Sequence, residues 1–168
     1  LNPKDAKLHS NLGGILKDLG KFKEAELSIR KAIDLNPRDA ILHLNLGVIF
    51  KDFGKLKEAE LSIRKAIEIK SDYAEAYLNL GVILKDLGKL KEGELSIHKA
   101  IELKPDYPEA YLNLGNIFKD LGKLKEADIS YRKAIDINPD YIEAYYNLVG
   151  ILRVFGKFKE AKLFLEKI

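Results

Sequence analysis

The stretch 79–96 reads NLGVILKDLGKLKEGELS, and the stretch 45–62 reads NLGVIFKDFGKLKEAELS, which is nearly the same string. The step between them is 34 residues, and the same step separates Gly13, Gly47, Gly81 and Gly115. A fixed period of about 20–50 residues is typical of proteins in which small structural units stack, because each unit is too small to fold alone. The repeated stretch therefore predicts a repeat array.

The period divides the chain into a short lead, four full repeats and a truncated fifth repeat. The lead is 1–5, and the repeats are 6–39, 40–73, 74–107, 108–141 and 142–168. We predict that they form a single array over 1–168. The tripeptide Leu-Asn-Pro at the start recurs at 35–37, and the first residue is not methionine. Both observations indicate a piece of a longer array that continued upstream.

One repeat is predicted to be a pair of antiparallel helices. In repeat 74–107, four apolar residues share one helix face, namely Tyr77, Leu80, Leu84 and Leu87. Gly88 follows them and is predicted to end this helix in the left-handed conformation. A second apolar pattern comprises Leu90, Leu95, Ile97, Ala100, Ile101 and Leu103. Pro105 ends the second helix because it lacks a backbone N–H donor.

The start of the next repeat carries a predicted helix cap. Asp106 and Glu109 have the spacing of an N-terminal capping pair. Pro108 lies between them, in the first turn, where its missing N–H has no consequence. The sequence therefore predicts a helix that starts near Pro108.

Eight residues of repeat 74–107 match the tetratricopeptide pattern: Tyr77, Leu80, Gly81, Leu84, Gly93, Ile97, Ala100 and Pro105. The chain resembles that family over essentially its whole length, and five copies in one register make the match specific. The departures are His9 and His43 at the first aromatic site, Gly93 for alanine, Ser71 for proline and Val149 for glycine. The resemblance implies an all-α, right-handed α-solenoid whose first helices line a concave surface.

The amino-acid composition of the chain limits the classes of partner that it is expected to bind. The 29 Lys and Arg residues nearly balance the 26 Asp and Glu residues and alternate with them, which argues against a nucleic-acid partner. No apolar run reaches the roughly 18 residues of a membrane span, and no secretory leader precedes the repeats. The chain has no cysteine, which excludes disulfides and thiolate sites and fits a reducing compartment. We expect a cytoplasmic protein with no membrane partner.

The sequence shows no catalytic, cofactor or metal site. The glycines form neither GxGxxG nor GxxxxGK[ST], and the histidines have no ligand partner at helical spacing. Glu92 and Glu94 are interpreted as part of a solvated outer face of the second helix. The recurring serines, Ser28, Ser62, Ser96 and Ser130, are interpreted as small residues where helices approach. We expect a protein that is not an enzyme and binds no cofactor.

Two sets of repeated polar residues are the candidate binding residues. The Asn ladder comprises Asn11, Asn45, Asn79, Asn113 and Asn147, and the cation ladder comprises Lys17, Lys51, Lys85, Lys119 and Arg153. Asparagine costs several tenths of a kcal/mol relative to alanine inside a helix, so five copies on one face suggest a use. The resemblance implies that this face binds an extended peptide segment and that an Asn ladder contacts its backbone. The resemblance also implies another binding mode, a clamp of Lys, Arg and Asn residues on the terminal carboxylate of a peptide. This array is too uniform to show such a clamp, and only Asn116 suggests its second asparagine.

Several alternatives remain open at this point. The asparagines could be residues copied with their repeat, or could bond a neighbouring helix. The cation ladder would favour an acidic segment if it is free of the aspartates that follow its lysines, Asp18, Asp52, Asp86 and Asp120. The chain could also be the substrate-recruiting arm of a larger enzyme such as a glycosyltransferase, or a near-consensus designed array with no ligand. Val154 and Phe164 in the last repeat indicate an apolar contact surface, which either a further helix of the array or a second copy of the chain would cover.

Overall fold

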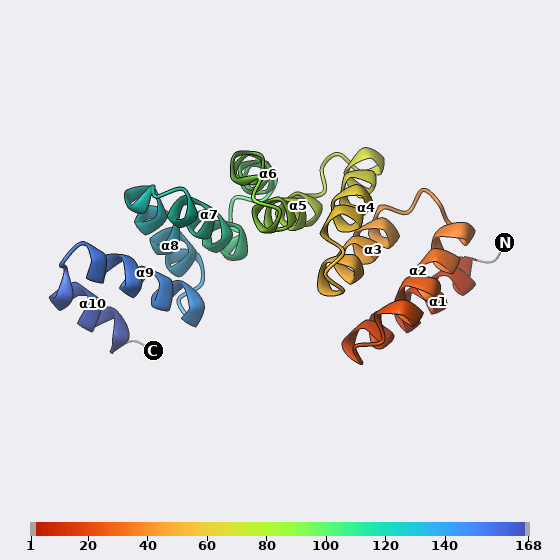
Figure 1. Ribbon diagram of the computed structural model, residues 1–168, viewed down its shortest axis with the longest axis horizontal. Coiled ribbons are helices and arrows are strands. Elements are labelled where there is room, and N and C mark those ends of the chain that lie inside the picture. The colour runs from red at the N-terminus through yellow and green to blue at the C-terminus, as the bar shows by residue number, and fades with distance from the viewer. Residues whose placement is uncertain (1–2, 167–168) are drawn as a thin grey trace.

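The computed structural model describes residues 3–166, and this part of the chain folds into ten helices and no strand. The helices are α1 (Pro3–Asp18), α2 (Phe22–Leu35), α3 (Ala40–Asp52), α4 (Leu56–Ile69), α5 (Ala74–Asp86), α6 (Leu90–Leu103), α7 (Pro108–Asp120), α8 (Leu124–Ile137), α9 (Ile142–Val154) and α10 (Phe158–Leu165). They form an arch with the two termini at opposite ends (Figure 1). The predicted all-α fold is confirmed.

The helices pack as antiparallel pairs that stack in chain order. Each odd-numbered helix packs on the even-numbered helix that follows it, and each pair packs on the next pair. Neighbouring first helices also contact one another, as in α1 with α3, α3 with α5 and α5 with α7. Within residues 3–166, no two second helices pack to a comparable extent. The stack therefore curves toward its first helices, and the molecule is a right-handed α-solenoid.

Glycine ends the first helix of each repeat, as predicted. Gly88 has a φ of 76°, and the backbone N–H of Lys89 donates to the Leu84 carbonyl at 2.8 Å. Its four counterparts also have positive φ values, between 71° and 78°. The left-handed conformation is accessible to glycine because it has no Cβ. This residue type thus fixes where each hairpin turns.

The helix starts agree with the sequence in position but differ in capping. α7 starts at Pro108, yet its N-cap is Tyr107, and no side chain caps it. The prediction that Asp106 caps this helix is wrong, because Asp106 lies one residue before the capping position. At the start of α3 an aspartate does stand at the N-cap position. This residue, Asp39, accepts a hydrogen bond from the Ile41 N–H at 2.9 Å. The one-residue difference decides whether the carboxylate reaches the helix.

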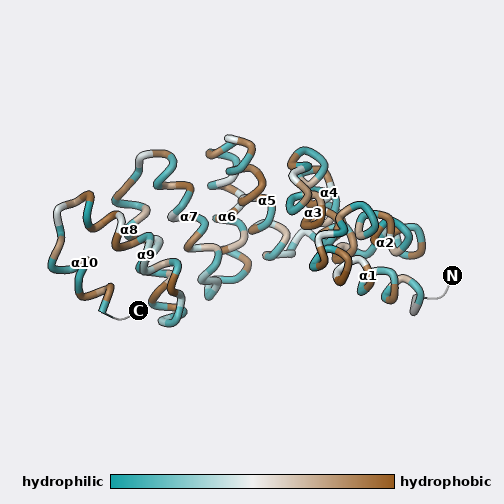
Figure 2. Tube along the Cα trace, turned by 60° about the horizontal axis from the view of Figure 1, so that its bottom comes forward, coloured by the Kyte–Doolittle hydropathy of each residue, from teal (hydrophilic) through white to brown (hydrophobic). Residues whose placement is uncertain are grey.

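The core runs along the solenoid between the two helices of each pair and between neighbouring pairs. Apolar and polar residues alternate along each helix, so that one face is buried (Figure 2). Ile83, Leu84 and Ile97 are buried, in agreement with the apolar pattern of repeat 74–107. Leu95 belongs to the same predicted pattern but is 70% exposed. The apolar pattern of the second helix therefore includes a residue outside the buried face.

In the part of the chain that the structure describes, no helix is long and apolar enough to cross a membrane. The same residues contain no group of three or more His, Cys, Asp or Glu side chains that could hold a metal ion.

Candidate functional site

The candidate site is the inner face of the solenoid, which we define as the side where neighbouring first helices contact one another. Side chains of the Asn ladder and the cation ladder meet across these contacts. The Asn45 amide on α3 donates to the Ser10 hydroxyl on α1 at 3.4 Å. The Lys17 ammonium on α1 lies 3.9 Å from the Asp52 carboxylate on α3. Both ladders therefore follow the inner face from repeat to repeat.

Four asparagines of the ladder, Asn45, Asn79, Asn113 and Asn147, each donate one amide hydrogen. Asn79 donates to the Glu75 carbonyl at 2.9 Å, and Asn113 donates to the Glu109 carbonyl at 2.8 Å. These two bonds lie within the residue's own helix, whereas Asn45 and Asn147 donate to a neighbouring helix. A carboxamide has two N–H donors and one oxygen acceptor. Each of the four thus keeps an oxygen with no donor among residues 3–166, and a second N–H.

A cavity of about 460 Å³ opens beside the first two members of the ladder. It lies between α1 and α3 and is lined by Asn11, Asn45 and Ser10, among others. A smaller cavity of about 100 Å³ follows it and is lined by Asn45, Lys17 and Val48. Asn45 lines both cavities, so a chain that follows the inner face would pass along this amide.

The cation ladder is partly neutralised. Lys17, Lys51 and Lys85 each lie 3.3–3.7 Å from a carboxylate oxygen of the aspartate that follows them in the sequence. Lys119 and Arg153 have no carboxylate within 4.0 Å among the described residues. The condition for an acidic preference, lysines free of aspartate, is therefore not met at the first three positions. Unpaired cations remain only toward the C-terminal end of the ladder.

The opposite edge of the inner face is acidic and aromatic. Glu75 and Glu109 lie exposed at the starts of α5 and α7. Tyr107 lies near both of them, and burial together with these carboxylates raises its pKa to about 12. At physiological pH the Tyr107 hydroxyl thus stays protonated and able to donate. The inner face therefore has a carboxylate edge and a cationic edge, with the asparagines between them.

Two asparagines meet at one place on the inner face. The Asn116 oxygen on α7 accepts from the Tyr131 hydroxyl at 2.9 Å and from the Asn147 amide at 3.4 Å. Tyr131 is fully buried, which raises the pKa of its hydroxyl and keeps it a donor. Because these bonds fix the Asn116 oxygen, its NH2 group is the part that can contact a ligand. Asn116 is the asparagine outside the Asn ladder that the sequence analysis pointed out.

The structure contains a set of ion pairs between repeats that the sequence analysis missed. An acidic residue on each of the first three second helices bonds a lysine at the start of the next second helix: Glu26 with Lys55 at 3.2 Å, Glu60 with Lys89 at 2.8 Å and Glu94 with Lys123 at 3.2 Å. The Glu94 side chain is 21% exposed and ion-paired, which agrees with the prediction of a salt-laced outer face, but the sequence analysis did not identify Lys123 of the next repeat as its partner. The sequence did contain a signal for these pairs, because the lysine follows the acidic residue by 29 positions in every pair.

These ion pairs are expected to make stability depend on pH. The hydrogen bond from Lys89 holds the pKa of Glu60 below its ordinary value of 4.5, against the opposing effect of burial, with a further bond from Arg64. A carboxyl whose pKa is lower in the folded state stabilises the fold above its unfolded pKa and loses this contribution as pH falls through the folded value. Glu60→Gln should therefore lower the free energy of unfolding at pH 7 and flatten its decline below pH 4.5. Urea unfolding over this pH range measures both effects.

The matched control is Glu58→Gln on the same helix. The Glu58 carboxylate has no ion pair among residues 3–166, so this variant should keep the wild-type pH dependence. Parallel curves for Glu60→Gln and wild type would contradict a contribution from the ion pair between repeats.

Comparisons with known proteins agree with the geometry. Family models described as tetratricopeptide repeat match 11–74 and 74–107, and one described as TPR repeat matches 98–122 and 115–148. No curated protein sequence matches the chain.

Three solved structures illustrate the similarity. A crystal structure of MamA is 27% identical, with 92% of this chain and 91% of that chain covered and a TM-score of 0.81. The pilF protein of Pseudomonas aeruginosa is 22% identical, with 98% and 75% covered and a TM-score of 0.91, which shows the shared fold. The first TPR of Spaghetti (RPAP3), solved with the HSP90 peptide SRMEEVD, is 25% identical, with 73% and 97% covered and a TM-score of 0.69.

Proposed function

Because the chain belongs to the tetratricopeptide repeat family, we propose that it is a non-catalytic scaffold that binds an extended protein segment along its inner face. The observation that carries this proposal is the hydrogen-bonding state of the Asn ladder. Four of its amides are held by one donor each and keep an oxygen and an N–H available. A peptide unit offers the complementary pair, one C=O and one N–H.

The spacing of the ladder suits an extended chain. Packed helices lie about 8–10 Å apart, and an extended chain advances about 3.3–3.6 Å per residue. One asparagine would then meet roughly every third residue, and a segment of about 11 residues would pass all five. Recognition through the main chain leaves the side chains of the segment free, so the range of bound sequences should be broad.

The charges on the inner face set a secondary preference. A carboxylate in the bound segment is accommodated best beside Lys119 and Arg153, where no aspartate neutralises the cation. A basic residue suits the edge that carries Glu75 and Glu109. The peptide bound to the Spaghetti (RPAP3) domain, SRMEEVD, is an example of an acidic segment held by a related array. We therefore extend the proposed partner to segments with acidic residues toward one end of the ladder.

The broader context of the scaffold follows from the same proposal. A cytoplasmic location is consistent with the absence of cysteine from the chain. A substrate-recruiting arm of a larger enzyme, such as a glycosyltransferase, would use the same inner face in the same way. The third hypothesis is a near-consensus array without a ligand. A binding experiment distinguishes it from the scaffold and from the substrate-recruiting arm.

The test is to select binders from a random peptide library of about 11–12 residues, the length that passes the whole ladder. A photo-reactive amino acid placed at Glu75, on the inner face, should cross-link to a selected peptide. The same label at Lys91, an exposed residue of the second helix α6, is the control and should not. Cross-linking from position 91 alone would place binding on the other face, and a library without binders would support the array without a ligand.

A second proposal is self-association through the fifth repeat. Val154 and Phe158 are 68% and 66% exposed, and they form neighbouring apolar surface on α9 and α10. Phe164 contributes less than the sequence indicated, because its ring packs 5.9 Å from that of Tyr145. We expect the chain to dimerise at high concentration and the double variant Val154→Asp, Phe158→Ser to stay monomeric. Sedimentation equilibrium measures this, and a wild-type chain that is monomeric throughout would contradict it.

A further inference from the structure

Every repeat exposes one large apolar residue at the same position of its second helix. The five residues are Leu27, Leu61, Leu95, Ile129 and Leu163, and they are 61–70% exposed. They lie on the outer face, which we define as the side formed by the second helices. The middle repeats show the same exposure as the terminal ones, so the feature belongs to the repeat itself. An apolar residue kept exposed in this way five times indicates a contact surface.

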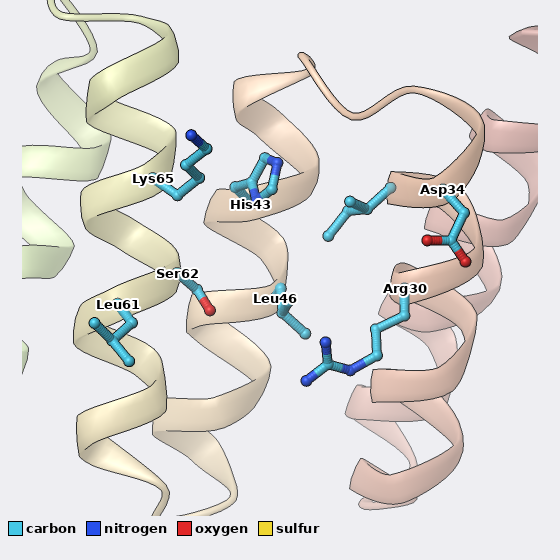
Figure 3. Close-up of a pocket in the computed structure, with 8 residues that line it drawn as sticks. Arg30, Asp34, His43, Leu46, Leu61, Ser62 and Lys65 are labelled. Carbon is cyan, nitrogen blue, oxygen red and sulfur yellow. The ribbon is translucent and has the colours of Figure 1, made fainter.

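Cavities lie beside two members of this row, at equivalent places in the second and fourth repeats. The first has a volume of about 360 Å³ and lies over α3, between α2 and α4. Figure 3 shows Arg30 on one side of it, His43 and Leu46 on its floor, and Ser62 and Lys65 on the other side. The second has a volume of about 440 Å³ and lies over α7, between α6 and α8.

The two cavities are built from corresponding residues. Tyr111 and Leu114 form the floor of the second cavity, as His43 and Leu46 form that of the first. Ile129, Ser130 and Lys133 correspond to Leu61, Ser62 and Lys65. Both serine hydroxyls turn back to their own helix, since Ser62 donates to the Glu58 carbonyl and Ser130 to the Glu126 carbonyl, each at 2.9 Å. The serines therefore leave the space above the floor residue open.

The fifth repeat shows what fits this space. It carries Phe164 at the position of these serines, and the Phe164 ring packs 5.9 Å from the ring of Tyr145, the counterpart of His43 and Tyr111. Tyr145 is consequently 5% exposed, whereas Tyr111 is half-buried. The guanidinium of Arg132 also lies 5.3 Å from the centre of the Phe164 ring. In the fifth repeat the Phe164 ring thus fills the space that stays open as a cavity over α3 and over α7.

The edges of both cavities carry a lysine together with one carboxylate, Lys65 with Asp34 at the first cavity and Lys133 with Glu126 at the second. Lys133 has no carboxylate within 4.0 Å among residues 3–166, and Lys65 pairs only with the exposed Glu68 on its own helix. Arg30, which pairs with Glu26 on its own helix at 3.0 Å, borders the cavity over α3 in the place that Arg132 takes beside Phe164. At the cavity over α7 this place is taken by His98. A guanidinium favours the face of an aromatic ring, and a lysine favours a carboxylate next to it.

We propose that the cavities over α3 and α7 are a pair of equivalent docking sites on the outer face, each for an aromatic side chain of a partner protein with a carboxylate beside it. The sites lie on the face opposite the Asn ladder and do not depend on the function proposed for the ladder. A partner bound there would leave the inner face free. The chain could then hold two different proteins at once.

The probe for this proposal is the peptide acetyl-Asp-Trp-Asp-amide. The protein has no tryptophan, so the fluorescence of the probe can be excited selectively. We expect saturable binding of two probes per chain, and no displacement by acetyl-Asp-Ala-Asp-amide. Ser62→Phe and Ser130→Phe reproduce the arrangement around Phe164 and should each remove one binding site. The two together should weaken binding by about tenfold or more, because the aromatic ring loses its buried position.

Three controls make the result decisive. Leu95→Phe adds a ring to the outer face without filling either cavity, and should bind two probes. Lys65→Glu with Lys133→Glu changes exposed side chains only, so it should stay folded and bind the acidic probe several-fold more weakly. Alanine at Asn45, Asn79 and Asn113 should leave probe binding unchanged. Unaltered binding to the folded double phenylalanine variant, or equal displacement by the alanine peptide, would overturn the proposal.

Discussion

Replacement of Asn45, Asn79 and Asn113 together by alanine is expected to weaken the binding of a selected peptide by about tenfold to a thousandfold. Each amide can pair with one peptide unit, and we take a net contribution of about 0.5–1.5 kcal/mol for each asparagine. Three lost contacts therefore sum to roughly 1.5–4.5 kcal/mol, at about 1.4 kcal/mol for each factor of ten. One replacement alone should cost about tenfold at most. Fluorescence polarisation with a labelled peptide measures the series.

We do not expect unfolding of the triple variant to account for a loss of peptide binding. Alanine has the higher helix propensity, and the bonds that Asn79 and Asn113 make go to carbonyls of their own helix, which the helix bond already satisfies. Asn45→Ala loses one long bond to Ser10 on α1, at 3.4 Å, which the gain in helix propensity offsets in part. The triple variant should therefore melt close to the wild-type temperature. A triple variant that is folded and binds as tightly as wild type would mean that the asparagines were merely copied with their repeat.

Gly115→Ala is expected to destabilise the fold by about 1–3 kcal/mol, the range for added volume in a packed core. A Cβ on Gly115 would lie 2.5 Å and 2.7 Å from two ring carbons of Tyr131. That ring is fully buried, and its hydroxyl bonds Asn116, so it cannot move aside without losing a second contact. For a chain of this size we expect the melting temperature to fall by roughly 3–10 °C. Thermal unfolding followed by circular dichroism measures it.

Gly150→Ala is the matched control. Gly150 also lies inside a first helix, α9, but a Cβ there would meet no atom within 4 Å. Alanine should stabilise this helix by roughly 0.5–1 kcal/mol because glycine is the poorer helix former. Destabilisation of both variants by the same amount would show that the close approach of α7 and α8 is not the reason for glycine at 115.

The parts of the fold that follow from local chemistry could be predicted from the sequence. The period located the repeats, and Gly88 ended its helix as expected because only the residue type and its own backbone decide that conformation. The Asn ladder was also visible, since the period alone places equivalent residues on equivalent faces. Two statements remain predictions. The first is that 1–168 forms one array with the stated repeat boundaries, and the second is that the ladders bind a peptide.

The rest depends on distances between repeats that a periodic pattern does not contain. Glu94 looked like any acidic residue on an exposed helix, and only the position of Lys123 in the next repeat makes it a partner. The sequence left open whether Asp86 neutralises Lys85, and the distance of 3.3 Å between them decides it. Leu95 fitted the apolar period of its helix but lies on the outer face, because helical spacing alone does not say how wide the buried side is.

The ion pairs between repeats also bear on how such a gene can change in length. Each of the first three repeats supplies an acid to the lysine of the repeat after it, and the second and third repeats supply both an acid and a lysine. A duplication of the 34 codons of the second or third repeat therefore delivers both halves of a new pair in register. The added unit also carries its own asparagine. The gene can lengthen by copying alone, and the reach of the encoded surface grows by one unit with each event.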